Sequence, residues 1–194
     1  MNNSAIQRVT DAIRARLNEA LGNAPDSDLV FIGPLHDTGA DDAFMVLFLY
    51  RVVPNPDLRN TRHVAPANNP ADPPVTYENA MPLDLYYILT AGGREDGGER
   101  DSLLRLGQAI QALNERPLFA GSGLDNEVVR LTMVPATSDE MSHVWALFPD
   151  QNFRTSILYL ASPVWIDPLA AIKPATPVVD SPHRLSPKNA GRMN

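Results

Sequence analysis

The chain contains no cysteine, and this absence excludes several kinds of site at once. Disulfides, thiolate zinc sites, iron–sulfur clusters and cysteine nucleophiles all need that residue. Long apolar runs are also missing, since the longest, AFMVLFLY at 43–50, is far short of the roughly 20 residues of a membrane-spanning helix. The first 21 residues are amphipathic and charged throughout, so we expect no signal peptide and no membrane partner.

Positive charge is scarce as well. The chain has 16 Lys and Arg residues against 23 Asp and Glu residues, which gives a net charge of −7. General nucleic-acid binding needs a concentrated basic face, so we expect no nucleic-acid partner. Aromatic residues make up 7% and lie within apolar runs, which argues against a stacking platform for single strands.

Proline, in contrast, is abundant and clustered. Twelve of the 18 prolines gather in two stretches, six between 54 and 74 and six between 163 and 187. Because proline fixes its backbone and donates no hydrogen bond, these stretches should not form regular helix or central strand. We therefore expect one domain over 1–167, which contains a long proline-rich loop over 54–80, followed by a C-terminal arm over 168–194.

The hydrophobic periodicity of the remaining residues predicts an α/β (α+β) domain, with a mixed sheet flanked by about three helices. Thr137 and Glu140 in the sequence TSDE have the spacing of a capping box, so a helix should begin there. The apolar face of another helix should consist of Leu103, Leu106, Ile110 and Leu113. Helices are expected over 4–21, over 99–116 and after 137, and strands over 29–32, 43–53, 82–91, 127–134 and 153–166.

A glycine-rich stretch at 92–98 lies between a predicted strand and a predicted helix, which is the layout of a phosphate-binding loop. Such a loop needs Lys followed by Ser or Thr after its last glycine, but Glu99, Arg100 and Asp101 stand there. Its acidic residues would repel a phosphate. We interpret the stretch as an exposed turn near a helix start, where acidic residues are favoured.

The sequence HDTGADD at 36–42 is the other candidate for chemistry, as a metal or acid–base cluster. A polar turn is the simpler interpretation, because Gly39 and the aspartates favour turns. None of the four histidines lies at metal-ligand spacing, and no serine lies in a nucleophile elbow. We thus expect no catalytic residue, cofactor or metal, while a small soluble α/β enzyme or a nucleotide- or metal-binding domain that uses 92–98 or 36–42 stays open as the alternative.

The arm is mildly basic beside an acidic domain. Its cationic residues alternate with prolines and with small apolar clusters, among them Val178 with Val179. An extended basic strip with spaced apolar residues is suited to lying along a neighbour's surface or adding to a sheet edge. A domain without an evident active site and with two long polar extensions is more typical of a protein that makes contacts than of an enzyme.

Several segments in order resemble one family. They are LFLYRVVPNPDLRN at 47–60, LDLYYILTAGG at 83–93, LLRLGQAIQALNERPLF at 103–119, TSDEMSHVWALF at 137–148 and FRTSILYLASPVWID at 153–167. This set resembles the N-terminal domain of tail-terminator, or cap, proteins of contractile injection systems, the phage-tail-like particles that include Photorhabdus virulence cassettes and antifeeding prophages. The resemblance extends from about residue 9 to residue 167, and neither 63–80 nor the arm has a matched pattern.

The resemblance implies a structural role rather than an enzymatic one. Six copies would form a ring on the distal end of the contractile sheath and the inner tube, and would stop both from growing. Such a protein would assemble in the bacterial cytoplasm and become part of a phage-tail-like particle. A closed ring repeats one head-to-tail interface, and obligate interfaces of this kind often bury 2,000 Å² or more, as an order of magnitude.

Three segments supply the candidate interface residues. Arg59 and Asn60 match the family's Arg-Asn pattern after a strand, the acidic turn would be a rim element, and the arm would lie along a neighbour. The residues are Arg59, Asn60, Arg94, Glu95, Asp96, Ile172, Lys173, Val178, Val179 and Arg184.

Overall fold

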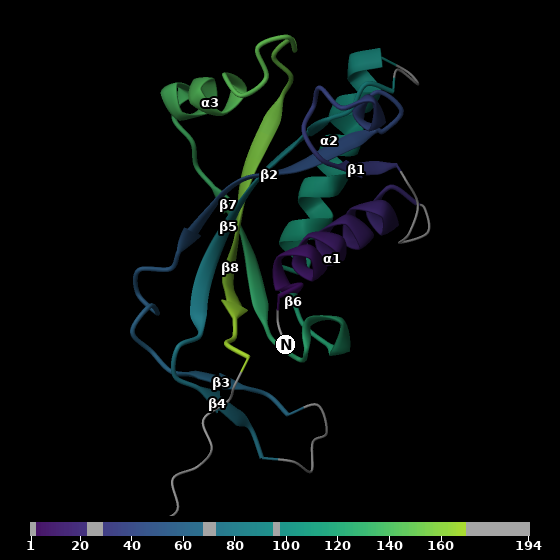
Figure 1. Cartoon of the computed structure of the whole chain (residues 1–194). Helices are drawn as coiled ribbons and strands as arrows, with labels where there is room; N and C mark the ends of the chain where they lie inside the picture. The colour runs from purple at the N-terminus through teal and green to yellow at the C-terminus, as the bar shows by residue number, and fades with distance from the viewer. Residues whose placement is uncertain (1–2, 23–28, 68–72, 95–97, 170–194) are drawn as a thin grey trace, which may run out of the picture.

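The computed structural model describes residues 3–22, 29–67, 73–94 and 98–169 (Figure 1). Its helices are α1 (Ala5–Ala20), α2 (Gly98–Glu115) and α3 (Ser138–Trp145), with short 3-10 turns at Thr38–Ala40 and Ser122–Leu124. Its strands are β1 (Val30–Ile32), β2 (Met45–Pro54), β3 (His63–Ala65), β4 (Val75–Tyr77), β5 (Met81–Ala91), β6 (Leu118–Phe119), β7 (Val129–Val134) and β8 (Ser156–Ile166). The predicted mixed α+β fold is confirmed.

The main sheet has six strands in the order β1-β2-β5-β8-β7-β6. Only β1 and β2 run parallel, and every other neighbouring pair is antiparallel. The long strands β2, β5 and β8 form its centre. Because β2 and β5 run in opposite directions, the sheet has one end where Met45 pairs with Ala91 and another where Pro54 pairs with Leu83.

Helices α1 and α2 cover one face of this sheet, on the right in Figure 1. The predicted helix over 4–21 is present as α1, and one face of it is buried, with Val9, Ile13 and Leu17 at most 2% exposed. Leu106 and Leu113 of α2 are buried as predicted, but Leu103 is 49% exposed. The prediction that Leu103 belongs to the buried face is wrong, because the first turns of α2 line an open groove.

Helix α3 covers part of the opposite face. The predicted capping box is present: Thr137 Oγ1 accepts from the Glu140 amide at 3.2 Å, and Glu140 Oε2 accepts from the Thr137 amide at 2.8 Å. Val144 and Trp145 of this helix pack with the buried side chains of Val46, Ile88 and Leu158. Toward the Pro54 end of the sheet this face is barer, since Tyr86 and Leu160 are only half-buried.

The proline-rich segment contains regular structure that the sequence pattern did not predict. Strands β3 and β4 form a separate antiparallel sheet, in which His63 pairs with Tyr77 and Ala65 with Val75. The prolines lie outside the two strands, which consist of residues that tolerate extended backbone. The segment is therefore an excursion that carries a small two-stranded ribbon.

No helix in the described ranges is both long and apolar enough to cross a membrane.

Candidate assembly surface

The glycine-rich stretch uses its first two glycines for packing. The Gly92 amide donates to the Phe44 carbonyl at 2.8 Å, and the Gly93 amide donates to the Ala40 carbonyl at 2.8 Å. A Cβ at Gly92 would overlap the Ala43 carbonyl, and one at Gly93 would lie 2.7 Å from Asp41 Cα. Both amides are therefore engaged with the preceding turn instead of being presented to a ligand. Residues 95–97 lie outside the described residues.

The turn at 36–42 is a structured polar turn. The Asp37 side chain accepts from the Gly39 amide at 3.1 Å and caps the 3-10 turn. The Phe31 ring packs against Gly33 and Gly39, where a side chain would collide with it. Within the described ranges, no group of three His, Cys, Asp or Glu side chains is arranged to hold a metal ion.

The candidate interface residues that the structure describes lie at opposite ends of the sheet. Arg59 and Asn60 are exposed in the chain that follows β2, beyond its Pro54 end. Arg94 is exposed after β5, at the Ala91 end, with its guanidinium 4.5 Å from the centre of the Phe44 ring. The structure does not bring these residues together. Glu95, Asp96, Ile172, Lys173, Val178, Val179 and Arg184 lie outside the described residues.

The sheet has two stepped edges. On one side β1 pairs only with Met45–Leu47, so within the described chain no strand pairs with the outer edge of the remaining length of β2. On the other side β6 pairs only with Val129 and Arg130, which leaves Thr132–Val134 of β7 without an outer strand among the described residues. Val52 on the first edge is 42% exposed and Met133 on the second is 39% exposed. Unpaired strand edges of this kind can accept a strand from another chain.

Exposed apolar side chains gather around a groove beside the glycine-rich stretch. The groove has a volume of about 490 Å³ and is lined by Leu103, Phe153 and the backbone of Gly92 and Gly93, among others. Phe153 is 67% exposed and Leu103 is 49% exposed. Large exposed apolar residues around a concave surface are typical of a contact site.

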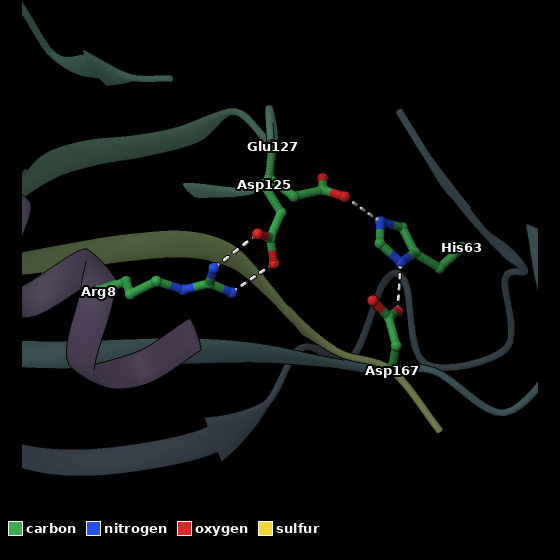
Figure 2. Close-up of polar contacts among 5 residues, drawn as sticks. All are labelled: Arg8, His63, Asp125, Glu127 and Asp167. Carbon is green, nitrogen blue, oxygen red and sulfur yellow. Dashed lines mark hydrogen bonds and ion pairs between the residues drawn. The ribbon is translucent and has the colours of Figure 1, made fainter. Parts of the chain in front are cut away.

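At the other end of the sheet, His63 joins three segments (Figure 2). Its Nδ1 lies 2.6 Å from Asp167 Oδ1, and its Nε2 lies 3.0 Å from Glu127 Oε1. Its ring stacks on Trp165 with a centroid distance of 4.3 Å and an interplanar angle of 7°. Burial lowers the pKa of His63, but the contacts with Glu127 and Asp167 outweigh burial and raise the pKa above its usual value.

A second ion pair lies beside this cluster. The Arg8 guanidinium donates to both carboxylate oxygens of Asp125, at 2.6 and 2.5 Å (Figure 2). The hydrogen bond from Arg8 holds the pKa of Asp125 below its usual range. This pair connects α1 to the turn that precedes β7.

Comparison with known families identifies the domain. A family described as the Pvc16 N-terminal domain matches residues 8–180. The chain belongs to this family. The match covers most of the chain and confirms the resemblance found in the sequence. No curated protein matches the chain.

Two solved structures share the fold of this Pvc16 N-terminal domain. The sheath/tube terminator of an extracellular contractile injection system, PVC, in its extended state matches 97% of this chain with a TM-score of 0.62 and 17% identity. The tube-terminating cap of the anti-feeding prophage matches 91% with a TM-score of 0.54 and 16% identity. This chain covers 65% of the first protein and 59% of the second, so it spans less than two thirds of either.

The sequence did not indicate the His63 cluster in this Pvc16-type domain. His63, Glu127 and Asp167 are separated by tens of residues, and none lies in a motif. The structure, not the sequence, shows that His63 opens the first strand of the ribbon and that its side chain is 4% exposed. An isolated histidine does not reveal its partners, because partners this distant in sequence are brought close by the fold alone.

Proposed function

We propose that this chain is a structural cap of a contractile injection system. Six copies form a ring on the distal end of the sheath and inner tube and stop both polymers from growing. The observation that carries this proposal is membership of the Pvc16 N-terminal domain family, together with a shared fold over 97% of the chain with a protein described as a sheath/tube terminator.

The physical argument for assembly rests on the two stepped edges. In a ring, every copy presents one surface to the copy before it and a different surface to the copy after it. The edges of β2 and β7 lie on opposite sides of the sheet, as such a head-to-tail contact requires. The exposed Val52 and Met133 would be covered there, which supports a contact between copies.

Contacts with the sheath and tube would come from the ends of the domain. Arg59 and Asn60 lie at one end, and Arg94 follows β5 at the other, beside the apolar groove. Residues 170–194 hold four Lys and Arg residues and one Asp, which gives a net charge of +3. Because the whole chain carries −7, the other 169 residues carry −10. This contrast favours an arm that lies along an acidic neighbouring surface. Assembly would occur in the bacterial cytoplasm before the particle is complete.

Mixing the purified chain with the matching sheath and tube proteins tests the proposal. Electron microscopy should show rings seated on polymer ends and shorter polymers as the chain concentration rises. Native mass spectrometry should show a species about six times the 21.2 kDa of one chain. A chain that stays monomeric and never reaches sheath or tube ends would contradict the proposal.

A truncated chain without residues 170–194 separates the contribution of the arm. Rings that still form and still bind polymer ends would place the contacts on the domain. Rings that form but no longer bind the ends would place end recognition on the arm.

A further inference from the structure

The His63 cluster lies where the arm leaves the domain. Asp167, which contacts His63 Nδ1, directly follows the last residue of β8, and Leu169 two positions later is 81% exposed. Glu127, which lies at Nε2, precedes β7. His63 itself opens β3 and therefore belongs to the ribbon. His63 of the ribbon thus contacts two carboxylates of the main domain, one before β7 and one after β8 (Figure 2). The second of these, Asp167, directly precedes the arm, and we call residues 167–169 the arm root.

The geometry requires a charged imidazole. A neutral imidazole has one N–H donor and one lone pair, whereas the imidazolium has two N–H donors. Carboxylates stand at both ring nitrogens of His63, at 2.6 Å and at 3.0 Å. Either neutral tautomer would therefore turn a nitrogen lone pair toward a carboxylate. The Glu127 contact is an ion pair by distance, without hydrogen-bond alignment, so its attraction depends on the charge of the ring.

The aromatic neighbours favour the same state. The Trp165 ring lies parallel to the imidazole at 4.3 Å, and the Tyr77 ring stacks at 6.3 Å. A cation is attracted to the face of an aromatic ring. The other charged groups near the cluster form pairs of their own: Arg8 with Asp125, and Arg62 with Glu78 at 3.3 Å.

The two strands of the ribbon are too short to fix its position by themselves. The ribbon contains three residue pairs, and an isolated two-stranded sheet is marginally stable in water. Val64 is 56% exposed, so the ribbon buries little apolar surface on that side. The charged contacts of His63 with Glu127 and Asp167 consequently supply a polar attachment of the ribbon to the main sheet.

We propose that His63, as an imidazolium, is a positioning residue that fixes the ribbon to the ends of β7 and β8 and so sets the point and direction from which the arm leaves the domain. This proposal rests on the proposed function in one respect only, namely that the arm then meets a neighbour. Loss of the charge leaves a carboxylate facing a lone pair and releases the arm root from the ribbon.

Spin labels test the proposal directly, because the chain has no native cysteine. Val64→Cys and Leu169→Cys place one label on the ribbon and one at the arm root, both at exposed positions of the full chain. We expect a narrow distribution of label distances at about pH 6, where histidine is charged, and a distribution at least twofold broader after His63→Gln at the same pH. Raising the pH should broaden the distribution of the protein that retains His63 as well.

The matched control is His36→Gln, since His36 is exposed in the turn at 36–42 and should leave the distribution narrow. Nitrogen chemical shifts of the His63 ring provide a readout that needs no substitution, and both nitrogens should be protonated above about pH 6.5. A distribution that stays equally narrow after His63→Gln and at high pH would overturn the proposal. A His63 ring that has already lost one of its two protons at about pH 6.5 would also overturn the proposal.

The two proposals can fail separately. If His63→Gln broadens the distance distribution while polymer ends are still capped normally, His63 positions the arm and the arm contact in the proposed function is wrong. If the distribution does not broaden while caps form normally, the positioning role is wrong and the cap function stands.

Discussion

The two ends of the sheet hold their connecting segments by different physics. At the end where Met45 pairs with Ala91, which we call the glycine end, the chain after β5 is fixed by backbone hydrogen bonds from Gly92 and Gly93 to the 40–44 turn. At the opposite end, the histidine end, the ribbon is fixed by the charged contacts of His63 with Glu127 and Asp167. The backbone hydrogen bonds of Gly92 and Gly93 do not depend on pH, whereas the contacts of the His63 imidazolium are lost when the ring loses a proton.

The two ends also differ in how visible they are in the sequence. The glycine end carries the pattern that looked most like chemistry, and its glycines are explained by steric fit against Ala43 and Asp41. At the histidine end, His63 lies in no motif, yet its side chain connects three distant segments. A glycine-rich turn can thus be purely structural, while a lone histidine can organise a surface.

The largest effect is expected from adding one methyl group at the glycine end. Gly92→Ala would drive a Cβ into the Ala43 carbonyl, so we expect a loss of at least about 3 kcal/mol in the free energy of unfolding. Gly107→Ala is the matched control: Gly107 lies in α2 with nothing near its Cβ position and should gain about 0.5–1 kcal/mol. Urea denaturation of both variants measures the difference. Equal stability of the two would mean that the close approach at Gly92 is not present.

The same collision affects the test of a ligand-binding role for 92–98. Loss of ligand binding in a Gly92 variant would follow from misfolding alone, so it cannot identify a phosphate site. Asp41→Ala, at an exposed position in the neighbouring turn, is the better probe. A saturable thermal shift with a nucleotide or divalent metal, abolished by Asp41→Ala, would support the alternative enzyme or binding role over the cap.

A smaller effect, which depends on pH, should be confined to the histidine end. The pKa of His63 is raised in the folded protein, so its contribution to stability is fully present below the unfolded value of about 6.5 and is lost as the pH rises through the folded value. We expect His63→Gln to cost about 2 kcal/mol at about pH 6 and progressively less as the pH rises above that value, since charged hydrogen bonds contribute on that scale.

Arg8→Gln is the control for this titration. The pKa of Asp125 is lowered mainly by its hydrogen bond with Arg8, so that pair contributes above the unfolded value of about 3.9 and is lost only in acid. The cost of Arg8→Gln should therefore stay constant over the range in which the cost of His63→Gln declines. Urea denaturation at several pH values measures both. A cost of His63→Gln that does not change with pH would contradict a charged His63.

The sequence predicted those parts of the fold that local pattern determines. Apolar residues of α1 recur at helical spacing, and the capping box of α3 is a local four-residue pattern. The long strands β2, β5 and β8, of ten or eleven residues, are mostly apolar. Strands β3, β4 and β6 were missed because two or three residues carry no periodicity of their own, whereas the equally short β1 lies in the apolar run LVFI. Strand β6 pairs with β7 of the main sheet, whereas β3 and β4 pair with each other.

The candidate surface was less predictable for the same reason. Arg59 and Arg94 are exposed, but their placement at opposite ends follows from the pairing of β2 with β5. The Asp167 contact with His63 spans 104 residues, and no local pattern reports a contact of that range. Surface sites assembled by topology become visible only when the strand order is known.

The smallest effect compares two residues that occupy the same helical position, one with and one without its expected bond. Thr137 and Ser4 are both N-cap residues, but only Thr137 makes a side-chain capping bond. Thr137→Ala should therefore cost about 1 kcal/mol and lower Tm by about 2–4 °C, because the amide of Glu140 loses its acceptor. Ser4→Ala removes no such bond, so its effect should stay within about 0.5 kcal/mol. Thermal unfolding of both variants under one condition measures the contrast, and a larger loss for Ser4→Ala than for Thr137→Ala would show that α1, not α3, depends on its cap.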